Sequence, residues 1–169
     1  MRRAVASLVA LASVVALGLA GPQGAAVADT AAAAAEGGPK VVRFVPRASD
    51  DKRLRASWKR WTEARGTTYV TRVTRHCLGC GPKPALVRTE VRRQRLVSVR
   101  NDNNDKVLGW GRAWPMDRLY RLLRRGYRNA DDVAVRYDRR GVPISVAIDW
   151  DELAADEETY LTVRARTSG

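Results

Sequence analysis

Residues 49–77 read SDDKRLRASWKRWTEARGTTYVTRVTRHC, and the spacing of their apolar side chains changes at Gly66. Before that glycine the apolar positions recur every three or four residues, at Leu54, Trp58, Trp61 and Ala64. This is the period of one face of an α-helix, and we expect a helix that begins at the N-cap residues Ser49 and Asp50 and ends at Gly66. From Thr67 to Cys77 the chain is rich in Thr, Tyr and Val and alternates with a period of two, which predicts a strand.

Outward from this stretch, the chain shows five more strand-like segments and a second helix. The strand-like segments are residues 85–91, 95–100, 132–137, 144–149 and 160–166, and the helix spans about residues 115–125, with Gly126 at its end. Arg92-Arg93-Gln94 looks like a tight connection, although it lacks the glycine that a two-residue hairpin turn prefers. Short connections between consecutive strands imply antiparallel pairing. We therefore predict an α+β fold, an antiparallel sheet of about six strands with two helices on one face, in the order α-β-β-β-α-β-β-β.

The first 28 residues have the pattern of a secretory signal peptide. Two arginines precede an apolar, alanine-rich stretch, and the small-residue motif Ala26-Val27-Ala28 follows, so we expect cleavage after Ala28. The apolar stretch is short and weakly apolar for a transmembrane span. We predict a secreted protein with no span after cleavage, a flexible leader over residues 29–48 and a single domain over residues 49–169. Within the leader, the apolar residues 41–45 could form an edge strand or drape over the core.

The charge balance indicates an anionic partner. The chain has 31 Lys plus Arg against 18 Asp plus Glu, a net charge of +13, and acidic residues outnumber basic ones only after residue 130. Guanidinium groups bind carboxylates and phosphates through paired hydrogen bonds, and a basic surface attracts polyanions. We predict an anion-binding surface formed by Arg72, Arg75, Arg88, Arg92, Arg93, Arg95, Arg118, Arg121 and Arg125. The alternative is that the basic and acidic parts neutralise each other in the fold. No sequence-reading nucleic-acid motif is present, so we expect no sequence-specific nucleic-acid partner.

Cys77 and Cys80 are the only cysteines, and export would place them in an oxidising compartment. A Cys-x-x-Cys at the end of a strand can close a small disulfide, and we predict that it does so here. A redox-active pair uses a helix N-terminus, whereas Pro82 and Pro84 follow here and no helix begins. A zinc site would lack a fourth ligand because His76 is the single histidine. We predict no cofactor.

The sequence offers little for catalysis. A Ser-His-Asp triad would have to use His76, and no Gly-x-Ser-x-Gly motif exists. The acidic residues around Asp138, Asp149 and Asp156 could supply the carboxylate pair of a glycosidase or bind a metal, or form a solvated acidic loop. Residues 101–105, NDNND, resemble the start of a calcium loop, but a lysine stands where that loop requires glycine, which excludes an EF-hand.

Several motifs follow one another in an order that resembles a known family. They are Trp58 and Trp61, the strand from Tyr69 to Cys77-Leu78-Gly79-Cys80, Val87-Arg88-Thr89-Glu90-Val91, the helix Met116 to Leu123, Tyr137-Asp138-Arg139-Arg140-Gly141-Val142-Pro143, and Ile148-Asp149. Over about residues 50–165 this order resembles the DUF6174 family of exported actinobacterial proteins of unknown function. The chain departs from the family pattern at Val142, where a tyrosine is usual. The resemblance implies the fold and export, and it carries over no catalytic residue.

These observations favour a secreted, non-enzymatic module that binds an anionic component of the cell envelope or an acidic protein through its arginine-rich face. The alternative is a secreted hydrolase or metal-binding protein that uses Asp138, Asp149 and Asp156. The two hypotheses differ in whether Asp138 and Asp149 converge in one pocket. A third hypothesis is a structural protein whose basic and acidic parts meet between copies.

Overall fold

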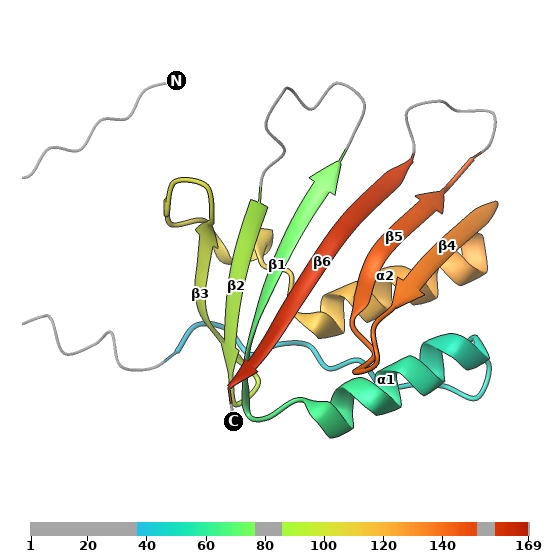
Figure 1. Cartoon of the computed structure of the whole chain (residues 1–169), viewed down its shortest axis with the longest axis horizontal. Coiled ribbons are helices and arrows are strands. Elements are labelled where there is room, and N and C mark those ends of the chain that lie inside the picture. The colour runs from blue at the N-terminus through green and yellow to red at the C-terminus, as the bar shows by residue number, and fades with distance from the viewer. Residues whose placement is uncertain (1–36, 77–85, 152–157, 169) are drawn as a thin grey trace, which may run out of the picture. The chain divides into compact units, whose positions relative to one another are not determined.

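The computed structural model describes residues 37–76, 86–151 and 158–168, and in these residues the chain forms one sheet and two α-helices (Figure 1). The elements, in chain order, are α1 (Lys52–Ala64), β1 (Thr68–His76), β2 (Leu86–Arg92), β3 (Arg95–Asn101), the short 3-10 helix η2 (Trp110–Arg112), α2 (Met116–Asn129), β4 (Asp132–Tyr137), β5 (Pro143–Asp149) and β6 (Thr159–Ser168). The predicted α+β class and element order are confirmed. The predicted signal peptide, Cys77 and Cys80 lie outside the described residues. None of the described helices is long and apolar enough to cross a membrane.

The sheet has six strands in the order β3-β2-β1-β6-β5-β4, and all neighbours are antiparallel. Each half of the chain supplies three consecutive strands, β1–β3 and β4–β6. The last strand, β6, lies between β1 and β5 and joins the two halves (Figure 1). The β1–β6 register runs from Thr68 opposite Ser168 to His76 opposite Tyr160. The central pair of strands therefore depends on residues from opposite ends of the domain.

One face of the sheet carries the core. Alternate residues of each strand point to this face, as the strand period requires, and on β1 these are Tyr69, Thr71 and Val73, all buried. Both helices pack there. Trp61 of α1 meets the Tyr69 ring edge-on, with 5.2 Å between the ring centres, and α2 buries an apolar stripe. That stripe consists of Met116, Leu119, Tyr120 and Leu123. Among the described elements, no helix covers the opposite face, which we call the open face.

The segment before α1 belongs to the packed domain. Val41 and Phe44 are buried. The centre of the Phe44 ring lies 4.9 Å from that of Trp58 and 5.4 Å from that of Tyr120. The main-chain N–H of Phe44 donates to the buried Asp117 carboxylate at 2.9 Å. Val41 and Phe44, which lie in the predicted flexible leader, therefore contribute to the core. This segment drapes over α2, with one isolated bridge from residue 40 to β3.

Asp50 has a different role from the one predicted. The carboxylate of Asp51 caps α1 by accepting hydrogen bonds from the main-chain N–H groups of the first turn at 2.8 and 3.0 Å. Asp50 is instead buried, 2.6 Å from the Arg124 guanidinium and 3.2 Å from that of Arg128. Burial acts to raise the pKa of Asp50, but hydrogen bonds from Arg124 and the Arg47 N–H, with the nearby positive charges, hold it below its ordinary value. Asp50, one of the two predicted N-cap residues, thus forms ion pairs that tie the N-terminal segment to α2.

The predicted end of the second helix at Gly126 is wrong, because α2 continues to Asn129. Gly126 is buried, and a Cβ at that position would lie 3.2 Å from the Ile148 side chain and 3.3 Å from that of Val133. The glycine therefore lets α2 approach the sheet closely. Its helix-stopping tendency is offset by this packing.

The tight β2–β3 connection is present without glycine. Arg93 and Gln94 have φ values of 47° and 64°, the left-handed region that hairpin turns need. Both residues have partners outside the hairpin: the Arg93 N–H donates to the Thr67 carbonyl at 2.7 Å, and the Gln94 carbonyl accepts from the Val41 N–H at 2.8 Å. These bonds compensate for the unfavourable conformation.

Candidate anion-binding site

Four arginines from four neighbouring strands stand in one row on the open face. Arg100 of β3 is opposite Arg88 of β2, Arg88 is opposite Arg72 of β1, and Arg72 is opposite Arg164 of β6. Neighbouring strands are about 4.8 Å apart, so the four side chains form a regular ladder. We call these four residues the arginine row. Like charges directly opposite one another repel, and the row therefore requires anionic groups beside it.

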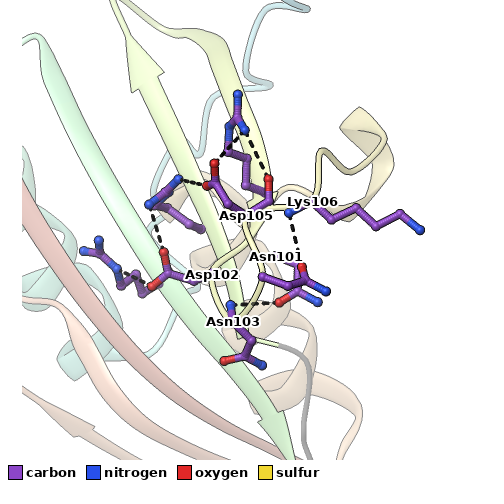
Figure 2. A network of polar contacts seen from close by, with 9 residues as sticks. Asn101, Asp102, Asn103, Asp105 and Lys106 are labelled. Carbon is purple, nitrogen blue, oxygen red and sulfur yellow. Dashed lines mark hydrogen bonds and ion pairs between the residues drawn. The ribbon is translucent and has the colours of Figure 1, made fainter.

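The chain supplies two of these anionic groups from the loop after β3 (Figure 2). Asp102 lies 2.7 Å from Arg72 Nε and 3.0 Å from an Arg88 terminal nitrogen, so its carboxylate bridges these two arginines. Asp105 lies 2.5 Å from Arg88 and 2.9 Å from Arg100 and bridges the next two. Each interval between neighbouring arginines from β3 to β1 thus holds one carboxylate.

The loop that carries these carboxylates is the NDNND segment that resembles a calcium loop. Asn101 Oδ1 accepts from the Asn103 N–H at 3.0 Å, and Asn104 Oδ1 accepts from the Lys106 N–H at 3.1 Å. Asn side chains that bind the main chain two residues later form tight local turns. Asp105 has a φ of 56°, and the Asn101 N–H donates to the Lys106 carbonyl at 2.8 Å. The turns fold the loop back over β2 and β3, and they place its carboxylates on the arginine row.

The last interval of the row, between Arg72 and Arg164, is different. Arg164 is exposed, and no carboxylate within the described residues forms an ion pair with it or with Arg166, two residues further along β6. Arg166 lies on the same face as Arg164 because side chains alternate along a strand. Arg72 contacts Asp102 through Nε, which leaves its terminal nitrogens for a second acceptor. Among the described residues, the open face thus presents a carboxylate position that is not filled, with two exposed arginines beside it.

The structure divides the nine arginines predicted as one surface. Arg72, Arg88 and Arg92 lie on the open face, where Arg92 is 3.4 Å from Glu90. Arg93 and Arg95 are exposed at the β2–β3 turn, at one edge of the sheet. The remaining four, Arg75, Arg118, Arg121 and Arg125, lie on the side of the sheet that the helices cover. The structure therefore brings only part of the predicted set together.

Two of the α2 arginines are engaged by main-chain carbonyls. Arg118 donates to the carbonyls of Gly111 at 2.8 Å and Ala113 at 2.6 Å, and its guanidinium stacks 4.2 Å from the Trp114 ring centre. Burial is the main cause that lowers the pKa of Arg118. Arg121 donates to the Val42 carbonyl. These contacts hold the chain segments on either side of α2 and leave these side chains less free for a ligand.

The acidic residues of the alternative hypothesis do not converge. Asp138 lies in the β4–β5 turn, where its carboxylate accepts from the N–H groups of Arg140 at 2.9 Å and Val142 at 2.8 Å. Asp149 lies at the other end of the same hairpin, at the end of β5. Asp156 lies outside the described residues. Within residues 37–76, 86–151 and 158–168, no group of three or more His, Cys, Asp or Glu side chains could hold a metal ion.

Sequence reasoning missed Arg164 of the row and the charged residues that lie beside the row. Arg164 and Arg166 occur in a segment whose overall charge is negative, and Asp102 and Asp105 occur in a loop for which only an EF-hand was considered, and excluded. The alternation of Thr162, Arg164 and Arg166 along a predicted strand was the available signal. Which strand would lie beside them is not encoded in that pattern.

A family of unknown function, DUF6174, matches residues 53–167. The match covers more than half of the chain, so the chain belongs to this family, and the resemblance seen in the motifs is confirmed. No curated protein and no solved structure shows significant similarity to the chain.

Proposed function

We propose that this member of the DUF6174 family is a non-enzymatic module that, after export, binds an anionic polymer of the cell envelope through the open face of its sheet. The observation that supports the proposal is the pattern of the arginine row. Two intervals of the row hold a carboxylate of this chain, whereas no carboxylate of the described residues forms an ion pair in the interval between Arg72 and Arg164.

The loop carboxylates indicate how a ligand would bind. Asp102 shows that one carboxylate accepts from two arginines on neighbouring strands at 2.7 and 3.0 Å. A ligand carboxylate or phosphate between Arg72 and Arg164 would have the same arrangement, and Arg166 would contact the next anionic group. Hydrogen bonds between charged groups are short and strong. A polymer fits this surface better than a small ion, because the free arginines lie along β6 on a face that no described helix covers.

The test is binding of the purified protein to immobilised teichoic acid as a function of salt. We expect binding at low ionic strength and a steep loss as salt rises, because each guanidinium that pairs with a polymer phosphate displaces a condensed counterion. The double variant Arg164→Gln/Arg166→Gln should bind about tenfold or more weakly, since each lost charged hydrogen bond is worth about 1.5–3 kcal/mol.

The matched control is Arg112→Gln/Arg139→Gln, which removes the same charge from two exposed positions outside the strands, one in η2 and one in the β4–β5 turn. It should bind within about twofold of the wild type, because most of the affinity should come from the row. Equal losses in the two double variants would mean that net charge alone drives binding, and no binding at low ionic strength would remove the proposal. Binding to acidic protein with none to teichoic acid would identify the other partner class.

A further inference from the structure

A pocket of about 350 Å³ opens on the helix-covered side of the sheet, beside α2 and the ends of β1, β5 and β6. The described residues that line it include Arg75, Arg125, Trp114, Trp150, Leu122 and Thr159. Its size is in the range of small-molecule sites, and its lining combines aromatic side chains with a few charged groups, as such sites do. The pocket is separate from the arginine row, because Arg72 and Arg75 point to opposite faces of β1.

The Trp114 wall of the pocket is held by two threonines inside the core. The Thr71 hydroxyl donates to the Trp114 carbonyl at 2.6 Å, and the Trp114 N–H donates to the Thr89 hydroxyl at 2.9 Å. Both threonines are fully buried, at 0% exposure, among apolar strand residues. Buried hydroxyl groups need partners, and these two use theirs to fix the main chain of Trp114. The Arg118 guanidinium, 4.2 Å from the ring centre, packs on the Trp114 indole.

The Trp150 part of the lining is positioned in a similar way. Trp150 Nε1 donates to the Thr159 hydroxyl at 3.1 Å, which ties the end of β5 to the start of β6. The Arg125 guanidinium lies 4.7 Å from the Trp150 ring centre. A guanidinium stacked on an indole keeps its in-plane N–H groups available at its edge. Arg125 is thus oriented by the aromatic wall, without an ion pair to any described residue.

The charges of the lining residues indicate what charge a ligand of the pocket would carry. Arg75 and Arg125 supply two positive charges, and Glu158 is the acidic residue among the described lining residues. Arg75 is exposed and, like Arg125, has no ion-pair partner in the described part of the chain. One excess positive charge matches a monoanion such as a carboxylate better than a phosphate dianion.

We propose that this pocket binds a small aromatic carboxylate. The flat ring would pack against Trp114 and Trp150, where apolar area is removed from water, and the carboxylate would lie between Arg75 and Arg125. Recognition requires both parts, because the lining combines two indoles with two guanidinium groups.

Titration calorimetry with three probes tests the inference on the full-length mature protein: 2-naphthoate, the neutral 2-naphthamide with the same ring, and acetate with the charge alone. We expect 2-naphthoate to bind with one-to-one stoichiometry and at least tenfold more tightly than either other probe. Arg75→Gln and Arg125→Gln should each weaken naphthoate binding about tenfold, for loss of one charged hydrogen bond.

The variant Arg164→Gln/Arg166→Gln separates this inference from the proposed polymer site. It should bind naphthoate like the wild type, whereas Arg75→Gln should bind teichoic acid within about twofold of the wild type. Equal affinity for naphthoate and naphthamide, equal losses in all the arginine variants, or no saturable naphthoate binding up to millimolar concentration would overturn the inference. Thermal melts of each variant establish that a loss of binding is not a loss of fold.

Discussion

The β4–β5 turn lies so close to α1 that one methyl group should disrupt the contact between them. Gly141 has a φ of 86°, and a Cβ built on it would lie 2.0 Å from the Ser57 carbonyl oxygen and 3.0 Å from the Trp61 main-chain nitrogen. The obstructing atoms belong to helix backbone and cannot rotate away. The Gly141 carbonyl also accepts the buried Tyr120 hydroxyl at 2.5 Å. We therefore expect Gly141→Ala to separate the turn from α1.

Two costs add in this variant. A left-handed conformation costs a residue with a Cβ about 1–2 kcal/mol. Relief of an overpacked contact typically costs about 1–3 kcal/mol, and here the shift also weakens the Tyr120 hydrogen bond. We expect a loss of about 3–5 kcal/mol in the free energy of unfolding. For a domain of this size that corresponds to a fall of roughly 10–20 °C in the melting temperature.

Urea and thermal unfolding, followed by circular dichroism, measure this loss. The matched control is Gly109→Ala, because Gly109 has an ordinary φ of −64° and a Cβ there would meet no atom within 4 Å. The control should unfold within about 0.5 kcal/mol of the wild type. A Gly141→Ala protein that unfolds within about 1 kcal/mol of the wild type would refute the close contact between turn and helix. Failure of Gly141→Ala to fold, alongside a folded control, would support it.

Three further predictions follow from the polar contacts. Asp50→Asn should lower the free energy of unfolding by about 3 kcal/mol at pH 7, because it leaves the part-buried Arg124 unpaired. The pKa of Asp50 is lowered in the fold, so its ionisation stabilises the fold above about pH 4 and this contribution is lost as the pH falls further. The difference in the free energy of unfolding between the two proteins, measured with urea, should therefore shrink below about pH 4, and a difference that stays constant would contradict this. Thr89→Val should cost about 1–3 kcal/mol and change the near-ultraviolet circular dichroism, because the Trp114 N–H loses its buried acceptor; an unchanged spectrum and stability would count against a fixed indole. Asp102→Asn should strengthen binding to teichoic acid several-fold at low salt while costing about 1 kcal/mol or less of stability, since it uncovers part of the arginine row; weaker binding would show that the loop takes part in recognition.

Local patterns located most elements to within a few residues, and each larger error has a long-range contact as its cause. Gly126 has the features of a helix stop, yet the space between α2 and the side chain of Ile148 requires a glycine inside the helix. Asp50 has the features of an N-cap, yet Arg124 binds it from a segment that follows much later in the chain. Sequence spacing reports on neighbours along the chain, and these residues interact with neighbours in space.

The candidate sites show the same difference. The abundance of arginine indicated anion binding, but the covered and open faces of the sheet separate Arg75 from Arg72 although only two residues lie between them. The carboxylates that partly neutralise the row come from a loop that resembles the start of a calcium loop but was excluded as an EF-hand. The pocket joins Trp114 and Trp150, for which no site was predicted, with Arg75 and Arg125, which were predicted as part of one larger anion-binding surface.

The amino-acid sequence by itself determined the two helices, the six strands, their antiparallel pairing and the basic charge. Periodicity, the length of connections and the ionisation of side chains can all be read from short segments of the chain. Only the tertiary structure decided that Arg164 lies beside Arg72, and that Asp102 and Asp105 occupy two intervals of the row but not the third. The physical reason is strand register. A slip of one residue between β1 and β6 would move Arg164 to the opposite face, and that register is set by how both halves of the sheet bury their apolar side chains against the helices.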